Sequence, residues 1–510
     1  MKHFPHRASR WWDGIALFAG MLYPLGFAPV GFRLATLASL VVFWCSLQGL
    51  AAGRAARRGY LFGLGLFGVG VAWVYESLSY FGEAIAAVAL LGTAGFIAVA
   101  ALYPMLFAWL WARFFVGRVT ASALCLALPS LWVLVEWFRG WFLGGFPWLV
   151  SGYASLDTTL EFTAQIGGVY FSSWVLLLLP AVISVSLCYG LSRKAAWLAV
   201  VCAAVLVVGA SHLRHVDFTD AVGEPLSVRM VQGNIEQGVK FDPDNIVPSL
   251  ERYIALSQQG DDNYDLLIWP ETAVPAFYEQ VDPVIGEFRD RLAMRGTDWL
   301  LGGFSFDWDT RRVFNAVRLV TDDSLSEYRK HHLVPFGEYL PFRSVLDALS
   351  SIIAVPMSDI SSGPSHPSPL EFDGLKVAVS ICYEDAFGEE VIRQLPAANL
   401  LVNVSNDAWF GDSWAPAQHH EIARMRTIET GRPQLRSTNT GISSLVDHRG
   451  RVIDVGPSFV EAVLDVSVQP RAGQTPYVRL GNHPVVLLLL TLVLVPAGLA
   501  RRAALSYTAD

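Results

Sequence analysis

The sequence predicts a multi-span α-helical membrane domain of about eight transmembrane helices, joined to an extracytoplasmic α/β domain. The first observation is composition, because 53% of the 510 residues are hydrophobic and 16% are charged. The mean hydropathy of +0.40 is far above that of an ordinary soluble protein. The second observation is that long apolar stretches fill the first part of the chain and return near its end. The third is that residues 212–483 contain only short apolar runs.

The long apolar stretches are each able to cross a hydrocarbon core, which takes about 20 residues of helix. Eight are predicted, near residues 12–30, 34–52, 59–80, 84–112, 119–138, 161–190, 195–211 and 484–500. The predicted domains are therefore a seven-helix transmembrane domain (1–211), a domain outside the membrane (212–483), and a C-terminal transmembrane helix with a short cytoplasmic tail (484–510).

Lysine and arginine are distributed unevenly between the two sides of this arrangement. Short cytoplasmic loops of membrane proteins are enriched in both residues. If the N-terminus is cytoplasmic, the short outer connections hold only Arg33 and Arg139. The inner segments then hold twelve basic residues, namely Lys2, Arg7, Arg10, Arg54, Arg57, Arg58, Arg113, Arg118, Arg193, Lys194, Arg501 and Arg502. This asymmetry predicts cytoplasmic N- and C-termini. The first apolar stretch lacks a small-residue cleavage site, so we expect it to be retained as a span.

Residues 212–483 differ in kind from the rest of the chain. Short apolar runs alternate there with polar and helical patterns, which is typical of an α/β or layered α-β domain. The runs are "LSVRMVQ", "DLLIWP", "WLLGGFSF", "FNAVRLV", "LKVAVSI" and "NLLVNVS". A Ser/Pro/Gly stretch, "SSGPSHPSP" at 361–369, predicts a loop within this domain.

Charge and histidine spacing argue against two classes of function. The net charge is −8 and the pI is near 5.8, so the chain lacks the basic surface that nucleic-acid binding needs. The paired histidines at 331–332 and 419–420 have no Cys or His neighbours at the spacing of a zinc site. We therefore expect neither a nucleic-acid partner nor a bound metal.

Cys382 is the only cysteine between residues 212 and 483, and it follows the apolar run that ends at Ile381. Cys45, Cys125, Cys188 and Cys202 all lie in predicted spans. Thiols outside the cytoplasmic membrane tend to be oxidised, so a lone cysteine there is a liability unless it is buried or used. Cys382 could be a buried small hydrophobic residue at a strand end. Its neighbours favour a nucleophile.

A cysteine nucleophile needs a base to take its proton and a positive group to stabilise the thiolate and the oxyanion. Two other predicted strand ends carry such groups. "DLLIWPET" ends with Glu271, and Lys330 follows the apolar run 313–320 within "SEYRKHHLVPFGEYLP". Either residue alone would usually be a solvated surface charge. Together with Cys382, they would form a base, a cation and a nucleophile at one edge of a sheet.

The order Glu, Lys, Cys, with the words around these residues, resembles the carbon-nitrogen hydrolase (nitrilase) superfamily and more closely its membrane-bound branch, the apolipoprotein N-acyltransferase family. The resemblance covers essentially the whole chain. The words that carry it are "WPET" (269–272), "YRKHHLVPFGEYLP" (328–341), "ICYED" (381–385), "NVSNDAWFGDS" (403–413), "PLGFAPVGF" (24–32) and "GGFPWLVSGY" (144–153).

The resemblance implies a nitrilase-like α-β-β-α sandwich outside the membrane. It implies that Glu271 is the general base, that Lys330 stabilises the oxyanion and that Cys382 is the nucleophile. Glu338 resembles the family's second carboxylate, which orients the lysine. Tyr383 and Glu384 follow the nucleophile, and the Tyr383 backbone N–H is a candidate second oxyanion donor.

The reaction that the resemblance implies is a two-step acyl exchange. The cysteine attacks the ester of a membrane phospholipid and forms an acyl thioester, and the free α-amine of a diacylglyceryl-modified apolipoprotein then takes the acyl chain as an amide. No cofactor is required. We expect a monomer in the bacterial cytoplasmic (inner) membrane, with the catalytic domain on the periplasmic side.

A lipid ester donor explains the apolar stretches, because its acyl chain must stay in hydrocarbon while its carbonyl reaches the cysteine. The site should therefore face the bilayer. Candidate substrate contacts at its rim are Trp148, within an aromatic loop that begins at Trp141, and Asn406, Trp409 and Phe410. Aromatic side chains also act as membrane-interface anchors, so the loop has this second interpretation.

Two alternatives compete with the acyltransferase hypothesis. A membrane-tethered amidase would use the same three residues on a small amide and would hydrolyse its thioester with water. A non-catalytic lipid-binding or scaffold protein would need none of them, and the intact set of Glu271, Lys330 and Cys382 argues against it.

Overall fold

The structure is a computed structural model that describes residues 9–81, 85–115, 120–190, 193–260, 263–339 and 360–506. It divides into two compact units. The helical unit comprises Met1–Tyr75, Leu90–Val216 and Leu480–Asp510, and the sandwich unit comprises Glu76–Ala89 and Asp217–Arg479. Of the basic residues used to predict orientation, Lys2, Arg7 and Arg118 lie outside the described residues, as do the last two positions of "YRKHHLVPFGEYLP".

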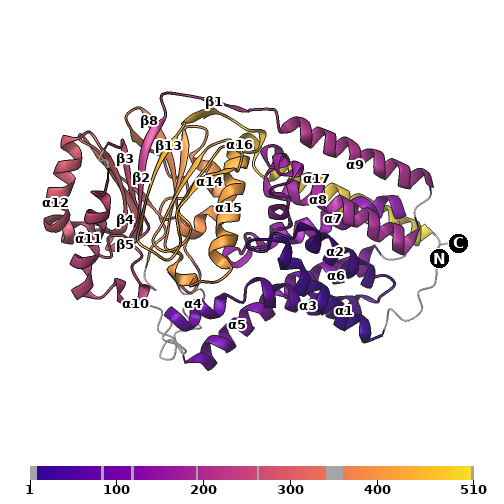
Figure 1. The fold of residues 1–510 in the computed structure, drawn as a ribbon. Coiled ribbons are helices and arrows are strands. Elements are labelled where there is room, and N and C mark those ends of the chain that lie inside the picture. The colour runs from indigo at the N-terminus through magenta and orange to yellow at the C-terminus, as the bar shows by residue number, and fades with distance from the viewer. Residues whose placement is uncertain are drawn as a thin grey trace. The chain divides into compact units, whose positions relative to one another are not determined.

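Helices make up the membrane-like part of the chain (Figure 1). Their bounds are α1 Trp11–Leu22, α2 Arg33–Ser46, α3 Ala52–Gly70, α4 Val74–Phe81, α5 Ala86–Ala100, α6 Leu102–Phe114, α7 Ala121–Arg139, α8 Ala164–Tyr189, α9 Arg193–Leu213 and α17 His483–Ser506. The last residues of α4 and the first of α5 belong to the sandwich unit.

The predicted eight spans are not confirmed as such. Within the described ranges, two stretches are long and apolar enough to cross a membrane, Ala86–Phe114 and Thr159–Tyr189. Breaks in the helices shorten other predicted spans. Helix α1 is followed by a 3₁₀ turn at Tyr23–Gly26, where Pro24 cannot donate a backbone hydrogen bond. A turn at residues 71–73 separates α3 from α4. Apolar composition alone could not reveal these breaks.

The sandwich unit is built on two stacked sheets, as expected. One sheet has the strand order β13-β2-β3-β4-β5-β6 and the other the order β12-β11-β10-β9-β8-β7. The first consists of β13 Ala462–Val468, β2 Leu226–Gln232, β3 Leu266–Trp269, β4 Asp298–Asp307, β5 Arg312–Val320 and β6 Leu325–Arg329. The second consists of β12 Val452–Val455, β11 Ser444–Val446, β10 Gln434–Thr438, β9 Leu400–Ser405, β8 Leu375–Ile381 and β7 Leu370–Phe372. A separate small sheet pairs β1 Thr219–Ala221 with β14 Arg471–Gly473.

Helices cover the outer face of each sheet, which gives the expected α-β-β-α layers (Figure 1). α11 Pro243–Ser257 and α12 Tyr278–Met294 lie on one side, and α14 Gly388–Val391 and α15 Ala415–Thr430 on the other. The inner faces pack on each other through residues such as Ile268, Val379 and Val402, all buried. Short helices α10 Gln237–Lys240 and α16 Pro476–Leu480 complete the unit.

Strand direction determines where the polar side chains gather. β2, β3 and β4 run parallel to one another, as do β8, β9 and β10. β6 is antiparallel to β5, which is antiparallel to β4, so β6 ends at the same edge as β3. The carboxyl ends of the strands that precede Glu271, Lys330 and Cys382 can therefore meet at one place.

Candidate active site

Cys382 begins a tight turn directly after β8. The turn is the 3₁₀ segment Cys382–Ala386, called the nucleophile turn below. The backbone of Cys382 has φ +53°, a left-handed conformation that non-glycine residues rarely adopt. This conformation ends the strand abruptly and leaves the thiol at the sheet edge. The side chain is buried, and it is a free thiol.

Glu271 lies on the loop after β3, with its carboxylate held by donors from three elements. Its Oε1 accepts from Asn315 Nδ2 (2.8 Å) and lies 3.6 Å from Lys330 Nζ. Its Oε2 accepts from the Asn406 backbone N–H (2.8 Å). Gly302 on β4 allows this loop to approach, because a Cβ there would lie 2.4 Å from the Pro270 carbonyl oxygen. The carboxylate is therefore oriented before any substrate arrives.

Lys330 follows β6 immediately and lies between two carboxylates. Its Nζ contacts Glu338 at 2.9 Å and Glu271 at 3.6 Å, and all three side chains are buried. Glu338 is itself held, because its Oε2 accepts from the Val334 N–H (2.8 Å) and its Oε1 from Asn315 Nδ2 (3.0 Å). The predicted second carboxylate thus contacts the predicted lysine directly.

The pKa values of Lys330 and Cys382 are both raised, for different reasons. Burial opposes the charge on Lys330, but Glu338 and Glu271 outweigh it and raise its pKa, so the lysine stays protonated. Burial and the negative Glu271 raise the pKa of the Cys382 thiol, and Lys330 opposes this only in part. The cysteine therefore rests as a thiol, and it needs a base at the moment of attack. Glu271 is the carboxylate with the largest electrostatic effect on that thiol, which makes it the candidate base.

Glu384 joins the nucleophile turn to the segment that follows Lys330. Its Oε1 accepts from the backbone N–H groups of His331 (2.7 Å) and His332 (3.0 Å). Its Oε2 accepts from the Ile381 N–H (2.7 Å) and from the Tyr328 hydroxyl (2.8 Å). Four donors saturate this buried carboxylate, so its function is to hold the two segments in register. The neighbouring Tyr383 packs its ring against His332 and Phe387.

The predicted rim residues have different environments. Asn406 is buried in a polar network, where its Nδ2 donates to Gln237 (2.6 Å) and its Oδ1 accepts from Asn439 (2.9 Å). Trp409 and Phe410 are half-buried in the 3₁₀ turn Asp407–Phe410, and Ser77 of α4 donates to the Trp409 carbonyl oxygen (2.9 Å). The structure thus makes Asn406 a support for Glu271 and leaves the two aromatic side chains as candidate substrate contacts.

Trp148 is the predicted rim residue that belongs to the helical unit. It is 1% exposed and packs against Trp73, with ring centroids 5.3 Å apart, and against Phe146. As placed, its side chain is a packing residue and does not present a substrate-facing surface. Trp141 and Phe142 of the same loop are exposed. A substrate contact at Trp148 stays a prediction.

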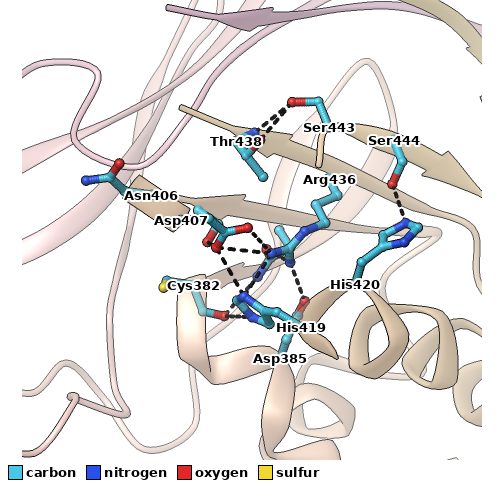
Figure 2. Close-up of polar contacts among 12 residues, drawn as sticks. Cys382, Asp385, Asn406, Asp407, His419, His420, Arg436, Thr438, Ser443 and Ser444 are labelled. Atoms are coloured by element: carbon cyan, nitrogen blue, oxygen red, sulfur yellow. Dashed lines mark hydrogen bonds and ion pairs between the residues drawn. The ribbon is translucent and has the colours of Figure 1, made fainter. Parts of the chain in front are cut away.

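Sequence reasoning missed several buried polar residues around the site. Asn315 interrupts the apolar pattern of β5 and bridges Glu271 and Glu338. Lys240, on α10, donates to the Glu271 carbonyl oxygen (3.2 Å). A second layer, centred on His419 and Arg436, lies behind Cys382 (Figure 2). For Asn315, the available signal was a polar residue inside an otherwise apolar run, whereas the mostly polar sequence of β10 gave no such signal for Arg436.

Two protein families match the chain. The apolipoprotein N-acyltransferase N-terminal domain matches residues 19–182. The carbon-nitrogen hydrolase family matches residues 227–477, which span both sheets of the sandwich unit. The two matches fall on the two kinds of structure that the chain contains.

Relatives match almost from end to end. The chain is 39% identical to the apolipoprotein N-acyltransferase of Methylococcus capsulatus, over 97% of both chains. It is 39% identical to that of Nitrosomonas europaea, over 95% of this chain and 97% of the relative. Among solved structures, the NitFhit protein of C. elegans matches with a TM-score of 0.38 and 17% identity, over 52% of this chain and 65% of that chain. The sequence relatives therefore include both the helical and the sandwich parts.

Proposed function

The chain belongs to the apolipoprotein N-acyltransferase family, and on this premise we propose that Glu271, Lys330 and Cys382 perform its acyl transfer. The enzyme is an acyltransferase that acts in lipoprotein maturation. The observation that carries the proposal is the geometry of Glu271, whose carboxylate accepts hydrogen bonds from Asn315 and Asn406 and lies 3.6 Å from the Lys330 ammonium. Its charge acts on the buried Cys382 thiol. Such an arrangement serves nucleophilic acyl transfer.

In the first half-reaction, the Cys382 Sγ attacks the ester carbonyl of a membrane phospholipid while Glu271 takes the thiol proton. The oxyanion forms beside Lys330 and the Tyr383 backbone N–H, which stabilise its charge. When the intermediate collapses, Glu271 returns the proton to the departing glycerol oxygen. The products are a thioester on Cys382 and a lysophospholipid.

In the second half-reaction, the free α-amine of a diacylglyceryl-modified apolipoprotein attacks the thioester carbonyl. Glu271 accepts a proton from the attacking nitrogen and delivers it to the departing sulfur. An amide forms, the thioester breaks, and the Cys382 thiol is restored. Glu338 contacts Lys330 at 2.9 Å and takes no part in these proton transfers, so its role in both steps is to orient the lysine.

The membrane arrangement belongs to the same proposal. The charge asymmetry supports eight spans, with residues 1–211 and 484–510 in the bacterial inner membrane and residues 212–483 on the periplasmic side. A lipid donor requires this setting, because its chains stay in hydrocarbon while its ester reaches the site. Trp409 and Phe410, both partly exposed, are the proposed acyl-chain contacts. We propose that the enzyme acts as a monomer.

The test is to stop the reaction halfway. Purified protein given phospholipid without an apolipoprotein should accumulate a thioester on Cys382, because the amine is absent and a lipid-lined site admits little water. Mass spectrometry should show one added acyl mass on the Cys382 peptide, removed by neutral hydroxylamine. A diacylglyceryl-cysteine peptide should then discharge the thioester, and the same peptide with a blocked α-amine should not.

Variants assign the roles in the same assay. Cys382→Ser should give no thioester, Glu271→Gln should slow its formation, and Lys330→Met should slow it by about 10² to 10³ or more, because the charge beside the oxyanion is lost. An unmodified Cys382 in the wild-type protein, together with turnover of a small primary amide, would instead establish the amidase alternative.

A further inference from the structure

The carbonyl oxygen of the nucleophile itself is held by two side chains. His419 on α15 places its Nε2 at 3.2 Å from the Cys382 carbonyl oxygen, and Asn403 on β9 donates to the same oxygen from its Nδ2 (3.3 Å). Figure 2 shows the imidazole of His419 directed at this oxygen, on the side away from the thiol. All three residues are buried. Neither donor contacts the groups assigned to proton transfer.

One arginine orients both donors. Arg436 on β10 donates from Nη1 to Asn403 Oδ1 (2.6 Å), and its Nη2 lies 2.9 Å from His419 Nδ1. The Cys382 carbonyl oxygen can only accept, so the hydrogen of this contact is carried by His419 Nε2. The other ring nitrogen, Nδ1, lies between Arg436 Nη2 and Asp407 Oδ1, 3.2 Å from the latter. The hydrogen bond from Arg436 Nη1 to Asn403 Oδ1 orients this amide, so that its NH₂ group points toward the Cys382 carbonyl oxygen. The two donors are thus specified by a single residue one layer behind them.

Arg436 is kept in place by buried charge. Its side chain is fully buried and forms ion pairs with Asp385 and Asp407, each at 3.1 Å. Burial disfavours a charged carboxyl, but Arg436 and His419 together outweigh this effect and lower the pKa of Asp407. A guanidinium between two carboxylates has little freedom to move, because removing either partner would leave a buried charge unpaired. The cluster is therefore rigid.

Anchoring this oxygen has a consequence on the other side of the peptide bond. The Cys382 carbonyl and the Tyr383 N–H belong to one planar trans peptide, so they point in opposite directions and rotate together. Cys382 is in a left-handed conformation, where an unsupported backbone would relax toward the commoner regions. Hydrogen bonds to the carbonyl oppose that rotation. They thereby set the direction of the Tyr383 N–H.

We propose that His419, oriented by Arg436, is a positioning residue that aims the Tyr383 N–H at the oxyanion by anchoring the Cys382 carbonyl. The inference rests on the proposed function, in which that N–H stabilises the intermediate. It assigns His419 no proton transfer and no contact with substrate. Its effect is specific to steps that pass through an oxyanion.

Two substitutions separate the contacts of His419. His419→Asn retains an acceptor near the Nδ1 position for Arg436 but has no group that reaches the Cys382 carbonyl, whereas His419→Gln retains a donor near the Nε2 position. The matched control is His420→Asn on the next residue, whose Nε2 contacts Ser444 Oγ (2.9 Å) and not the nucleophile (Figure 2). Full-length protein in detergent is given dipalmitoyl phosphatidylethanolamine, and thioester formation on Cys382 is timed.

A second readout is alkylation of Cys382 by iodoacetamide, which requires the thiol and its base but forms no oxyanion. His419→Asn should slow thioester formation roughly 10- to 100-fold, as expected when an oxyanion donor is misdirected. Its alkylation should stay within about threefold of the wild-type rate. His419→Gln should recover most of the acylation rate, and His420→Asn should match the wild type in both reactions.

Unchanged acylation in His419→Asn would overturn the inference, as would an equal loss of acylation and alkylation, which would indicate a displaced thiol. A loss in His420→Asn as large as that in His419→Asn would also overturn it. The proposed function fails separately, if the wild-type protein takes no acyl group from the phospholipid, and the inference then falls with it.

Discussion

Lys240 is a buried cation beside the catalytic carboxylate that no step of the mechanism uses. Its Nζ donates to the backbone carbonyl oxygen of Glu271 (3.2 Å), and in the described part of the chain no carboxylate lies within ion-pair distance of it. Burial lowers its pKa to about 7, although Glu271 opposes the shift. The lysine is 1% exposed. The buried lysine therefore lowers the free energy of unfolding at pH values below about 10.4, where the unfolded chain carries this charge in water.

Replacing Lys240 by methionine should stabilise the protein at pH 7. Between the folded pKa near 7 and the unfolded value of about 10.4, the unfolded chain binds more protons at this position, so wild-type stability rises with pH across that window. The advantage of Lys240→Met, on the order of 1–4 kcal/mol at pH 7, should shrink toward pH 10. Thermal unfolding in detergent at both pH values measures it.

Lys376→Met is the control for this prediction, because Lys376 is 40% exposed on its side chain and pairs with Glu371 on the surface. Its melting temperature should differ little from that of the wild type at either pH. An advantage of Lys240→Met that stays constant from pH 7 to pH 10 would show that packing, and not proton binding, separates the two proteins.

Single residues at strand ends were predictable from the sequence, and the residues behind them were not. Glu271 and Cys382 each follow an apolar run that forms a strand. Lys330 instead follows β6, a mostly polar strand that the apolar pattern did not predict, and it reaches the same edge because β6 is antiparallel to β5. His419 is one polar residue in a helix whose sequence is polar throughout much of its length. Its contact with Cys382 depends on the packing of α15 on the sheet, which the sequence pattern of that helix does not contain.

At the scale of elements, the active site depends on the connection between the nucleophile turn and the segment after β6. Glu384 makes that connection with four accepted hydrogen bonds, two of them from consecutive backbone N–H groups at 331 and 332. Burial raises the pKa of Glu384, while these donors favour its charged form. The turn and the Lys330 segment thus share one buried acceptor group.

Glu384→Gln should weaken this connection while preserving shape. A glutamine offers one accepting oxygen where the glutamate offers two, so its NH₂ group would face donors and leave at least one buried N–H unsatisfied, at a cost of about 1–3 kcal/mol. We expect a lower melting temperature and slower thioester formation on Cys382. Glu371→Gln, on the neighbouring strand β7 and 59% exposed on its side chain, is the matched control. Equal behaviour of the two variants would contradict the role given to Glu384.

The pattern of apolar residues predicted some elements and concealed others for physical reasons. β8 and β9 are apolar because their side chains fill the space between the sheets. β10, with the sequence QLRST, is buried at every position yet mostly polar, because its side chains join the network around Arg436. An apolar pattern cannot reveal such a strand. The helix breaks at Tyr23–Gly26 and at residues 71–73 were concealed for the opposite reason, since apolar residues continue through them.

At the scale of the whole molecule, the distribution of charge carries information that packing does not. Two helical stretches meet the criteria for crossing a membrane by length and apolar character. Twelve basic residues against two, on opposite sides of the eight predicted spans, are the basis for the proposed orientation. Long soluble domains follow the orientation of the spans before them, so the proposed topology places the sandwich unit on the outer side.

Fusions to alkaline phosphatase test that orientation, because this reporter folds and becomes active only where its disulfides can form, outside the cytoplasm. A fusion after residue 215, just before β1, should be active, and a fusion after residue 56, among Arg54, Arg57 and Arg58, should be inactive. If the second fusion is moved to follow residue 58, replacing Arg54, Arg57 and Arg58 with glutamine should raise its activity, since the charges that retain this loop inside are removed. Activity at residue 56 combined with inactivity at residue 215 would invert the topology. It would place Cys382 in the cytoplasm, where a lone thiol needs no protection from oxidation, and the acceptor lipoproteins would then have to be modified on that side.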